Sequence, residues 1–219
     1  MNESSKKLLR DYGLTVVIAV LVAVLIRVYL IEAYRIPSGS MRPTLEAGDT
    51  VFVKKSDYKI FGASPVRGDV IVFTDSANSK RDYIKRVVGI AGETVQLKDG
   101  KITIDGKAAT ITKLPDSDPS SKTCAKEWLI DQSSTHGVCW EPPLLEDTSP
   151  EKVPPGSVYV LGDTRSQSPA DIGKHKTWGI VPISSIQGKA AWIWMSVEPS
   201  AVRGWFPMFR FNRMMTRIN

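Results

Sequence analysis

A long apolar run near the N-terminus constrains the fold of this chain more than any other feature. Residues 14–26 carry no charge, and after Arg27 the apolar character resumes over residues 28–31. As a helix, residues 12–31 would be about 30 Å long, which matches the thickness of a bilayer core. Arg27 lies near the far end of this run, where its long side chain would reach the lipid headgroups. The run therefore predicts a transmembrane anchor.

The charges around the run predict its orientation. Lys6, Lys7 and Arg10 precede it, so the positive-inside rule places residues 1–11 in the cytoplasm and everything after residue 31 outside. A removable signal peptide is one alternative, but residues 32–35 read Glu-Ala-Tyr-Arg and offer no clean small-x-small cleavage site. A buried core helix is the other alternative, and the charge arrangement does not favour it.

After the anchor the pattern changes from helical to stranded. Short β-branched runs alternate with turn residues, and no helical periodicity of useful length appears. Asp99-Gly100, between two of these runs, is a strong β-hairpin signal. The fold class we expect is mostly β, an antiparallel sheet behind one N-terminal helix. The predicted strands are residues 50–54, 69–74, 83–90, 94–98, 101–104, 157–161 and 189–195.

Residues 105–155 differ in composition from the rest of the β-domain. They are rich in Pro, Ser, Asp and Thr and contain both cysteines, Cys124 and Cys139. We interpret them as a small loop-rich insertion in a β-core formed by residues 32–104 and 156–219. Two His and no Cys-x-x-Cys argue against zinc. The predicted topology exports both cysteines, so a disulfide is expected, contributing roughly 3 kcal/mol in the entropy model; two unpaired thiols are the alternative.

The chain is basic, with a net charge of +6. Such a balance suits nucleic acid or an anionic membrane surface. The middle of the chain has no basic cluster interleaved with aromatics and no nucleic-acid motif, so we expect no nucleic-acid partner. Residues 203–217 are basic and aromatic. They form either a membrane-facing surface or a strand and tail packed on the domain, and both interpretations stay open.

The segment of residues 36–44, just past the anchor, reads Ile-Pro-Ser-Gly-Ser-Met-Arg-Pro-Thr. Its prolines and glycine would hold two hydroxyls in a fixed turn, although an ordinary linker has the same composition. A serine nucleophile needs a base, and neither His136 nor His175 has an evident orienting carboxylate. Lys85 lies in an apolar strand, where burial would lower the pKa of a lysine from about 10.4 and supply a neutral amine. A solvent-facing lysine is the alternative.

Four blocks of the sequence carry a family resemblance. They are residues 36–44, 67–73 (RGDVIVF), 82–89 (DYIKRVVG) and 162–165 (GDTR). In this order, after a membrane anchor, they resemble the signature of type I signal peptidases, the bacterial leader peptidases. The resemblance covers most of the chain from the anchor to Met195. The joint occurrence of four blocks is highly specific, whereas any one alone is not.

The resemblance implies a membrane-bound serine endopeptidase that removes N-terminal signal peptides from exported preproteins. Cleavage would follow small residues in an Ala-x-Ala pattern, with no metal and no cofactor. The resemblance also implies a catalytic β-domain of the signal-peptidase type on the periplasmic side of the bacterial inner membrane, anchored by a single span. The expected partners are signal peptides and the lipid bilayer, and a monomer is expected.

The resemblance also implies roles for individual residues. Ser40 would be the nucleophile and Lys85 the general base, which then protonates the leaving amine. The Ser38 hydroxyl and the Ser40 N–H would form the oxyanion hole, whose donors typically contribute 10²–10³-fold. Ser168 would orient Lys85. The remaining implied residues are Arg86, Asp163, Arg165 and Asp171 in structural roles, with Arg86 paired to a carboxylate, and a substrate pocket of Ile36, Met41, Leu45, Tyr83 and Ile84.

The last block departs from the common family pattern. Thr164, Ser166 and Gln167 replace common residues, and Asp171 falls one position late. Ser166 therefore competes with Ser168 for the role of orienting the lysine. The departure does not affect the Ser/Lys pair.

The sequence has three alternative functional interpretations. A Ser/Lys self-cleaving repressor would be cytosolic with a DNA-binding region, whereas an apolar anchor leads this chain. A non-catalytic anchored β-domain is disfavoured because both Ser40 and Lys85 are present. A specialised peptidase that serves a single substrate stays open.

Overall fold

The computed structural model describes the chain from residue 12 to residue 218 with gaps. The described residues are 12–13, 15–22, 24, 29–75, 81–114, 123–129, 135–140, 142, 144–166, 179–203 and 206–218. Residues 15–22 are helical. Within these ranges, no helix combines the length and the apolar character needed to cross a membrane.

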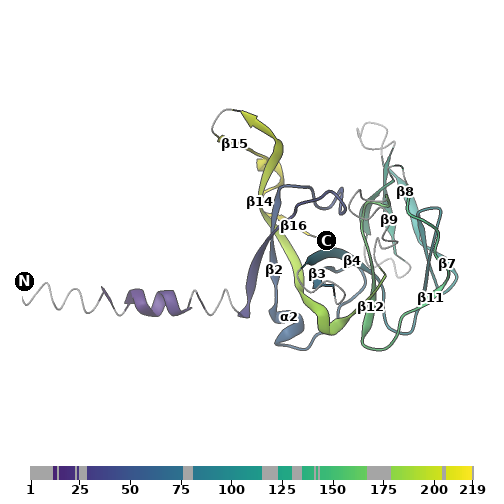
Figure 1. The fold of residues 1–219 in the computed structure, drawn as a ribbon, viewed down its shortest axis with the longest axis horizontal. Coiled ribbons are helices and arrows are strands. Elements are labelled where there is room, and N and C mark those ends of the chain that lie inside the picture. Colours follow the sequence, from purple (N-terminus) through teal and green to yellow (C-terminus); the bar gives the residue numbers. More distant parts are fainter. Residues whose placement is uncertain are drawn as a thin grey trace, which may run out of the picture.

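A large antiparallel sheet forms the centre of the molecule (Figure 1). Its strands follow the order β1-β2-β14-β3-β4-β12-β13, with β15 and β16 also paired to β14. The strands are β1 (Ile31–Arg35), β2 (Asp49–Lys54), β3 (Val70–Thr74), β4 (Asp82–Gly89), β12 (Ser157–Leu161), β13 (Ile180–Pro182), β14 (Ile186–Arg203), β15 (Phe206–Phe209) and β16 (Thr216–Arg217). Three short helices accompany them: α2 (Ser56–Lys59), η1 (Ile183–Ser185) and η2 (Phe211–Arg213).

Alternation of side chains builds the core of this sheet. In β2 the buried positions alternate with half-buried ones, and Val51 and Val53 are completely buried. In β3 the four residues from Val70 to Phe73 are all buried, which fits a strand covered on both faces. The expected mostly antiparallel β-domain is confirmed.

Two smaller sheets lie at one end of the molecule, where Figure 1 shows β7, β8, β9 and β11 together. One sheet has the order β10-β9-β8 and the other β11-β5-β6-β7. Their strands are β5 (Thr94–Lys98), β6 (Lys101–Ile104), β7 (Lys107–Ala108), β8 (Thr110–Lys113), β9 (Cys124–Trp128), β10 (Thr135–Cys139) and β11 (Glu151–Lys152).

The predicted hairpin between β5 and β6 is present. Lys98 pairs with Lys101, and Asp99 and Gly100 between them have φ values of 50° and 70°. Two central residues with positive φ are what a two-residue turn of type I′ requires. The Asp-Gly signal therefore predicted the turn correctly.

The segment of residues 105–155 has more regular structure than the loop-rich insertion that the sequence predicted. It contributes strands to both smaller sheets, and β9 pairs with β10 in a register that sets Cys124 opposite Cys139. The two cysteines form a disulfide, as expected. β9 and β10 were missed because they read Cys-Ala-Lys-Glu-Trp and Thr-His-Gly-Val-Cys, with few β-branched residues. β8 was missed although it reads Thr-Ile-Thr-Lys, a β-branched run.

Candidate active site

Ser40 lies in a tight turn within the connection of residues 36–48 between β1 and β2. Two backbone hydrogen bonds close this turn: the Arg42 N–H donates to the Gly39 carbonyl at 3.0 Å, and the Leu45 N–H donates to the Met41 carbonyl at 2.8 Å. We call residues 38–47 the Ser40 turn. Ser40 itself is half-buried, so its hydroxyl is held in place and still accessible.

Apolar side chains fix the Ser40 turn to the core. Ile36, Met41 and Leu45 are buried in one hydrophobic cluster, and Tyr34 and Ile84 pack against the same cluster from partly buried positions. Four of the five predicted pocket residues therefore lie together. Tyr34 was missed by the sequence analysis, although it is an aromatic residue two positions before Ile36.

The fifth predicted pocket residue lies elsewhere. Tyr83 packs against a different cluster, where its ring centroid is 6.1 Å from that of Phe73. Tyr83 and Ile84 are adjacent on β4, and successive side chains of a strand point to opposite faces. This alternation explains why only Ile84 joins the cluster below the Ser40 turn.

Lys85, on β4, reaches the Ser40 hydroxyl. Its Nζ lies 2.9 Å from Ser40 Oγ, which is hydrogen-bond distance. The lysine is only 5% exposed, and burial favours the neutral form of an amine. The structure thus brings together two residues that are 45 positions apart.

The segment of residues 162–166, after β12, contacts the other side of the Ser40 turn. The Thr164 N–H donates to the Ser40 carbonyl at 3.2 Å, and the Thr164 hydroxyl lies 2.8 Å from the Gly39 carbonyl and 3.2 Å from that of Arg42. Thr164 is one of the residues that depart from the common family pattern, and these contacts were not predicted. Sequence analysis had no local signal for them, because they join distant parts of the chain.

Arg86, next to Lys85, forms a buried ion pair. Its Nε and Nη2 donate to the two carboxylate oxygens of Asp163, each at 2.8 Å, and its Nη1 donates to the Gly68 carbonyl at 2.7 Å. Burial alone would raise the pKa of Asp163, but the charge and hydrogen bonds of Arg86 hold it below its usual value. This contact agrees with the expectation that Arg86 pairs with a carboxylate.

A second buried pair lies beside the first. Arg165 binds Glu127 on β9, and His136 on β10 lies with its Nε2 3.2 Å from Glu127 Oε2 and 3.7 Å from Asp163 Oδ1. The sequence offered no evident orienting carboxylate for His136, whereas strand pairing and long-range packing place two carboxylates near it. Burial and the positive charge of Arg86 hold the pKa of His136 below its usual value.

The other predicted site residues are placed as follows. Ser38 is exposed at the start of the Ser40 turn. Ser166 forms an isolated bridge with Leu144. Ser168 and Asp171, together with His175, lie outside the described residues.

A serine hydroxyl thus lies at hydrogen-bond distance from a buried lysine amine, which is the geometry that activation of a nucleophile by an adjacent base requires. A family model described as "Signal peptidase, peptidase S26" matches residues 9–195. This chain therefore belongs to the signal peptidase family, peptidase S26, and is a serine peptidase.

Two curated relatives agree with this membership. A signal peptidase I of Pseudomonas aeruginosa is 32% identical over 218 residues, covering 88% of this chain and 75% of the relative. Signal peptidase I T of Bacillus subtilis is 37% identical, with 72% of each chain covered. A crystal structure of a signal peptidase I from Enterococcus faecalis is 24% identical and covers 57% of this chain and 96% of that chain, at a TM-score of 0.35.

Proposed function

We propose that this chain removes N-terminal signal peptides from exported preproteins, cleaving after small residues in an Ala-x-Ala pattern. The contact of 2.9 Å between Lys85 Nζ and Ser40 Oγ is the observation that carries the proposal. Family membership supports it, because the relatives at 30% identity or more are named signal peptidase I.

The proposed reaction uses Ser40 as nucleophile and Lys85 as base. Neutral Lys85 accepts the hydroxyl proton while Ser40 Oγ attacks the scissile carbonyl carbon. The protonated Lys85 then donates this proton to the leaving amine, and an ester acyl-enzyme remains on Ser40. Water, deprotonated by Lys85, attacks the ester carbonyl carbon. The bond from this carbon to Ser40 Oγ then breaks, Lys85 returns the proton to Oγ, and the signal peptide leaves with a free carboxylate.

The oxyanion of the tetrahedral intermediate needs donors near Ser40. The Ser40 N–H and the Ser38 hydroxyl are the proposed donors. Both belong to the Ser40 turn, whose backbone is held by Thr164 from one side and by the apolar cluster from below. Preorganised donors of this kind stabilise charge without rearranging during the reaction.

A shallow apolar pocket for small substrate side chains is proposed above the cluster of Ile36, Met41, Leu45 and Ile84. Met41 and Leu45 are fully buried, so they would form its floor and exclude bulky residues by their volume. Tyr83 packs against another cluster, but it lies two positions from Lys85 on β4 and shares its face of the strand. It therefore stays in the proposed pocket, on the side of the base.

Lys85 is proposed to be oriented by a serine from the last block. Ser168 is our assignment and Ser166 is the alternative. Replacing each serine separately by Ala distinguishes them, since only the loss of the orienting serine should lower kcat strongly.

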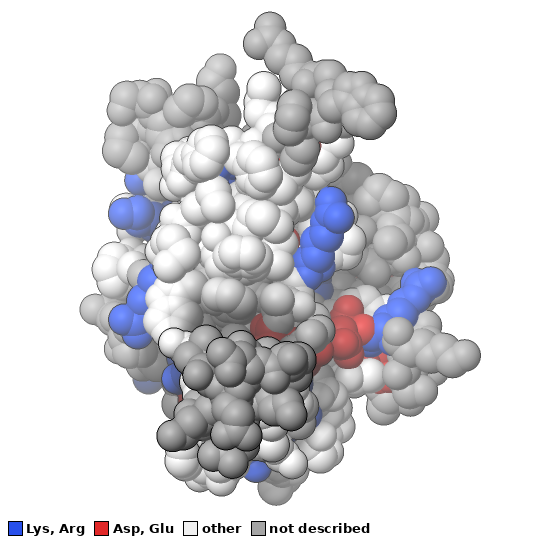
Figure 2. All heavy atoms as spheres, turned by 90° about the vertical axis from the view of Figure 1, so that its left-hand side faces the viewer, with Lys and Arg blue, Asp and Glu red and all other residues white. Residues whose placement is uncertain are grey.

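The proposed enzyme is anchored by the apolar run that begins at residue 12, with the N-terminus in the cytoplasm and the catalytic domain on the outer side of the bacterial inner membrane. Ile31, the expected last residue of this anchor, instead begins β1 and pairs with Lys54 of β2. Figure 2, seen from the N-terminal side, shows a largely uncharged area in the upper part of the described surface, with Lys and Arg on both sides and Asp and Glu at its lower right. Exposed apolar side chains in the C-terminal part of the chain are Trp192, Trp194, Met208, Phe209, Phe211 and Met215. Such a surface favours contact with the bilayer interface, where anchoring raises the effective concentration of membrane-held substrate.

The first experiment is cleavage of a preprotein with an Ala-x-Ala site by the detergent-solubilised full chain. Wild type, Ser40→Ala and Lys85→Ala are compared, and the new N-terminus is read by mass spectrometry. We expect cleavage after the second small residue by wild type and none by either variant, with all three proteins equally folded by circular dichroism. Full activity of Lys85→Ala would exclude the Ser/Lys mechanism. Folded wild type without activity would favour a dedicated substrate or a non-catalytic role.

A further inference from the structure

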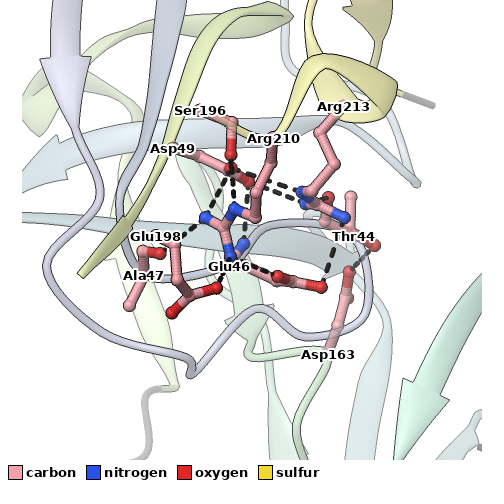
Figure 3. Close-up of polar contacts among 9 residues, drawn as sticks. All are labelled: Thr44, Glu46, Ala47, Asp49, Asp163, Ser196, Glu198, Arg210 and Arg213. Carbon is pink, nitrogen blue, oxygen red and sulfur yellow. Dashed lines mark hydrogen bonds and ion pairs between the residues drawn. The ribbon is translucent and has the colours of Figure 1, made fainter. Parts of the chain in front are cut away.

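Two arginines from the C-terminal segment bind the buried carboxylate of Asp49, which follows the Ser40 turn in the chain (Figure 3). Arg210 precedes η2 and Arg213 ends it. Arg213 Nη2 donates to Asp49 Oδ2 at 2.7 Å, and Arg210 Nη2 donates to Asp49 Oδ1 at 3.2 Å. The Ser196 hydroxyl donates to the same Oδ1 at 2.6 Å. A carboxylate with no exposure to solvent thus has its charge balanced by two guanidinium groups.

Asp49 is ionised in this environment. Burial alone would raise its pKa, but hydrogen bonds from Arg213, the Glu46 N–H and Ser196 outweigh burial and hold the pKa below its usual value. The pairs with the arginines are therefore ion pairs at neutral pH. Removing either arginine would leave a buried negative charge with less compensation.

The same two guanidinium groups bind the backbone of the Ser40 turn. Arg213 Nη2 lies 3.2 Å from the Thr44 carbonyl oxygen, and Arg210 Nη2 lies 2.7 Å from the Ala47 carbonyl oxygen. Arg210 Nη1 also binds the Glu46 carboxylate at 2.6 Å. Residues 44–47 are the second half of the turn that carries Ser40, so side chains from the last part of the chain hold this half.

Thr44 is held from its other side by the strand that carries Lys85. Its hydroxyl donates to Asp163 Oδ2 at 2.5 Å and accepts from Arg86 Nη2 at 3.1 Å. Arg86 is the neighbour of Lys85 on β4. Thr44 thus lies between two arginine-carboxylate systems, one anchored in the C-terminal segment and one next to the proposed base.

We propose that Arg210 and Arg213 are positioning residues, which hold the Ser40 turn against β4 and thereby set the distance between Ser40 and Lys85. This inference rests on the proposed function. Reacting groups must be within about 3–3.5 Å, and a misplacement of about 1 Å can cost 10²-fold in rate. Without the arginine contacts the turn keeps its apolar floor, Thr164 and the bonds of the Thr44 hydroxyl. The Thr44 and Ala47 carbonyls, however, lose the guanidinium groups that bind them.

The test uses the full chain in detergent and compares Arg213→Ala, Arg213→Lys and Arg210→Ala with Arg217→Ala. Arg217 is a matched control, because it is an exposed arginine on β16 of the same segment. We expect Arg213→Ala to lower kcat by about 10²-fold with a KM close to that of wild type. Arg213→Lys should lose less, since an ammonium restores the charge and some of the hydrogen bonds. Arg217→Ala should match wild type.

Hydrogen–deuterium exchange supplies a readout that does not depend on activity. The amides of Arg42 and Leu45, which close the Ser40 turn, should exchange faster in Arg213→Ala and at the wild-type rate in Arg217→Ala. Unchanged exchange and unchanged kcat in folded Arg213→Ala would overturn the inference. So would faster exchange throughout the domain with unchanged kcat per folded molecule, since that indicates a purely structural role. A wild type that does not cleave would contradict the proposed function, and exchange would still test whether the arginines hold the turn.

Discussion

Gly162 leaves room for the contact between Ser40 and Lys85. A Cβ added at this position would lie 2.6 Å from the Ser40 carbonyl oxygen and 3.3 Å from Lys85 Nζ. The closer atom belongs to the backbone, so it cannot rotate away as a flexible side chain would. Glycine is therefore required at this position because the centre of the site has no space for a Cβ.

Gly162→Ala is predicted to displace the Ser40 turn from Lys85. We expect kcat to fall by about 10²-fold, because a shift approaching 1 Å at the reacting atoms has a cost of this size. Gly179→Ala is the matched control, since the nearest atom to an added Cβ there is Glu151 Oε2 at an ordinary 3.8 Å. The measurement is cleavage of a signal-peptide substrate, with circular dichroism to verify folding. Equal activity of the two variants would show that the turn can adapt.

At the scale of the elements, the smaller sheets support the site through β10. The Cys139 N–H donates to the Asp163 carbonyl at 3.0 Å, and the Arg165 N–H donates to the Cys139 carbonyl at 2.7 Å. Cys139 is bonded to Cys124 on β9. The segment that contacts the Ser40 turn is therefore itself held by a disulfide-linked strand pair.

Removal of this disulfide is predicted to destabilise the domain. The cysteines are 15 positions apart, and closing a loop of this length contributes roughly 3 kcal/mol in the entropy model. The Cys124→Ser/Cys139→Ser variant should therefore unfold at a lower urea concentration than the oxidised wild type. A reducing agent should lower the midpoint of the wild type and leave that of the variant unchanged. Equal midpoints for all samples would contradict this prediction.

The sequence predicted the elements with strong local signals and missed those that depend on distant partners. Residues 94–98 and 101–104 were predicted with the observed bounds, because β-branched runs flank an Asp-Gly turn. β9 and β10 were missed because a cross-strand partner and a disulfide hold them, and their composition is that of a loop.

The same distinction holds for the site. Ser40 and Lys85 were found because each lies in a recognisable local block. Thr164, Arg210 and Arg213 were not, because each acts through contacts to residues more than a hundred positions away. No pattern within a single stretch of sequence reports such a contact.

At the scale of the whole molecule, buried charges connect the large sheet to the three-stranded sheet. Arg86 on β4 binds Asp163, Arg165 binds Glu127 on β9, and His136 on β10 lies beside both carboxylates. With neutral His136, the two arginines balance the two carboxylates. Protonation of His136 would add a buried positive charge next to Arg86, which explains why its pKa is lowered.

This arrangement predicts that the free energy of unfolding falls at acidic pH because His136 has a lowered pKa in the folded state. An unfolded chain takes up the histidine proton near pH 6.5, whereas the folded chain takes it up only at lower pH. The unfolded state therefore binds more protons as the pH falls below about 6.5, and the unfolding free energy drops by at most about 1.4 kcal/mol per pH unit. Asp163 and Glu127 have lowered pKa values, so their contributions are lost only at a more acidic pH.

Urea unfolding at about pH 7.5 and about pH 5.5, on either side of the usual histidine value, measures this loss. Wild type should be less stable at the lower pH, and His136→Gln should show a smaller difference. The chain has only two histidines, so His175→Gln is the natural control and should behave like wild type. The other titrating groups are present in all three proteins. Asp163 and Glu127, whose pKa values respond to His136, have pKa values below their usual range and titrate at a more acidic pH than this window. An equal pH dependence for wild type and His136→Gln would mean that the buried charge network tolerates a protonated histidine. The contact between the two sheets would then not depend on the neutral form of His136.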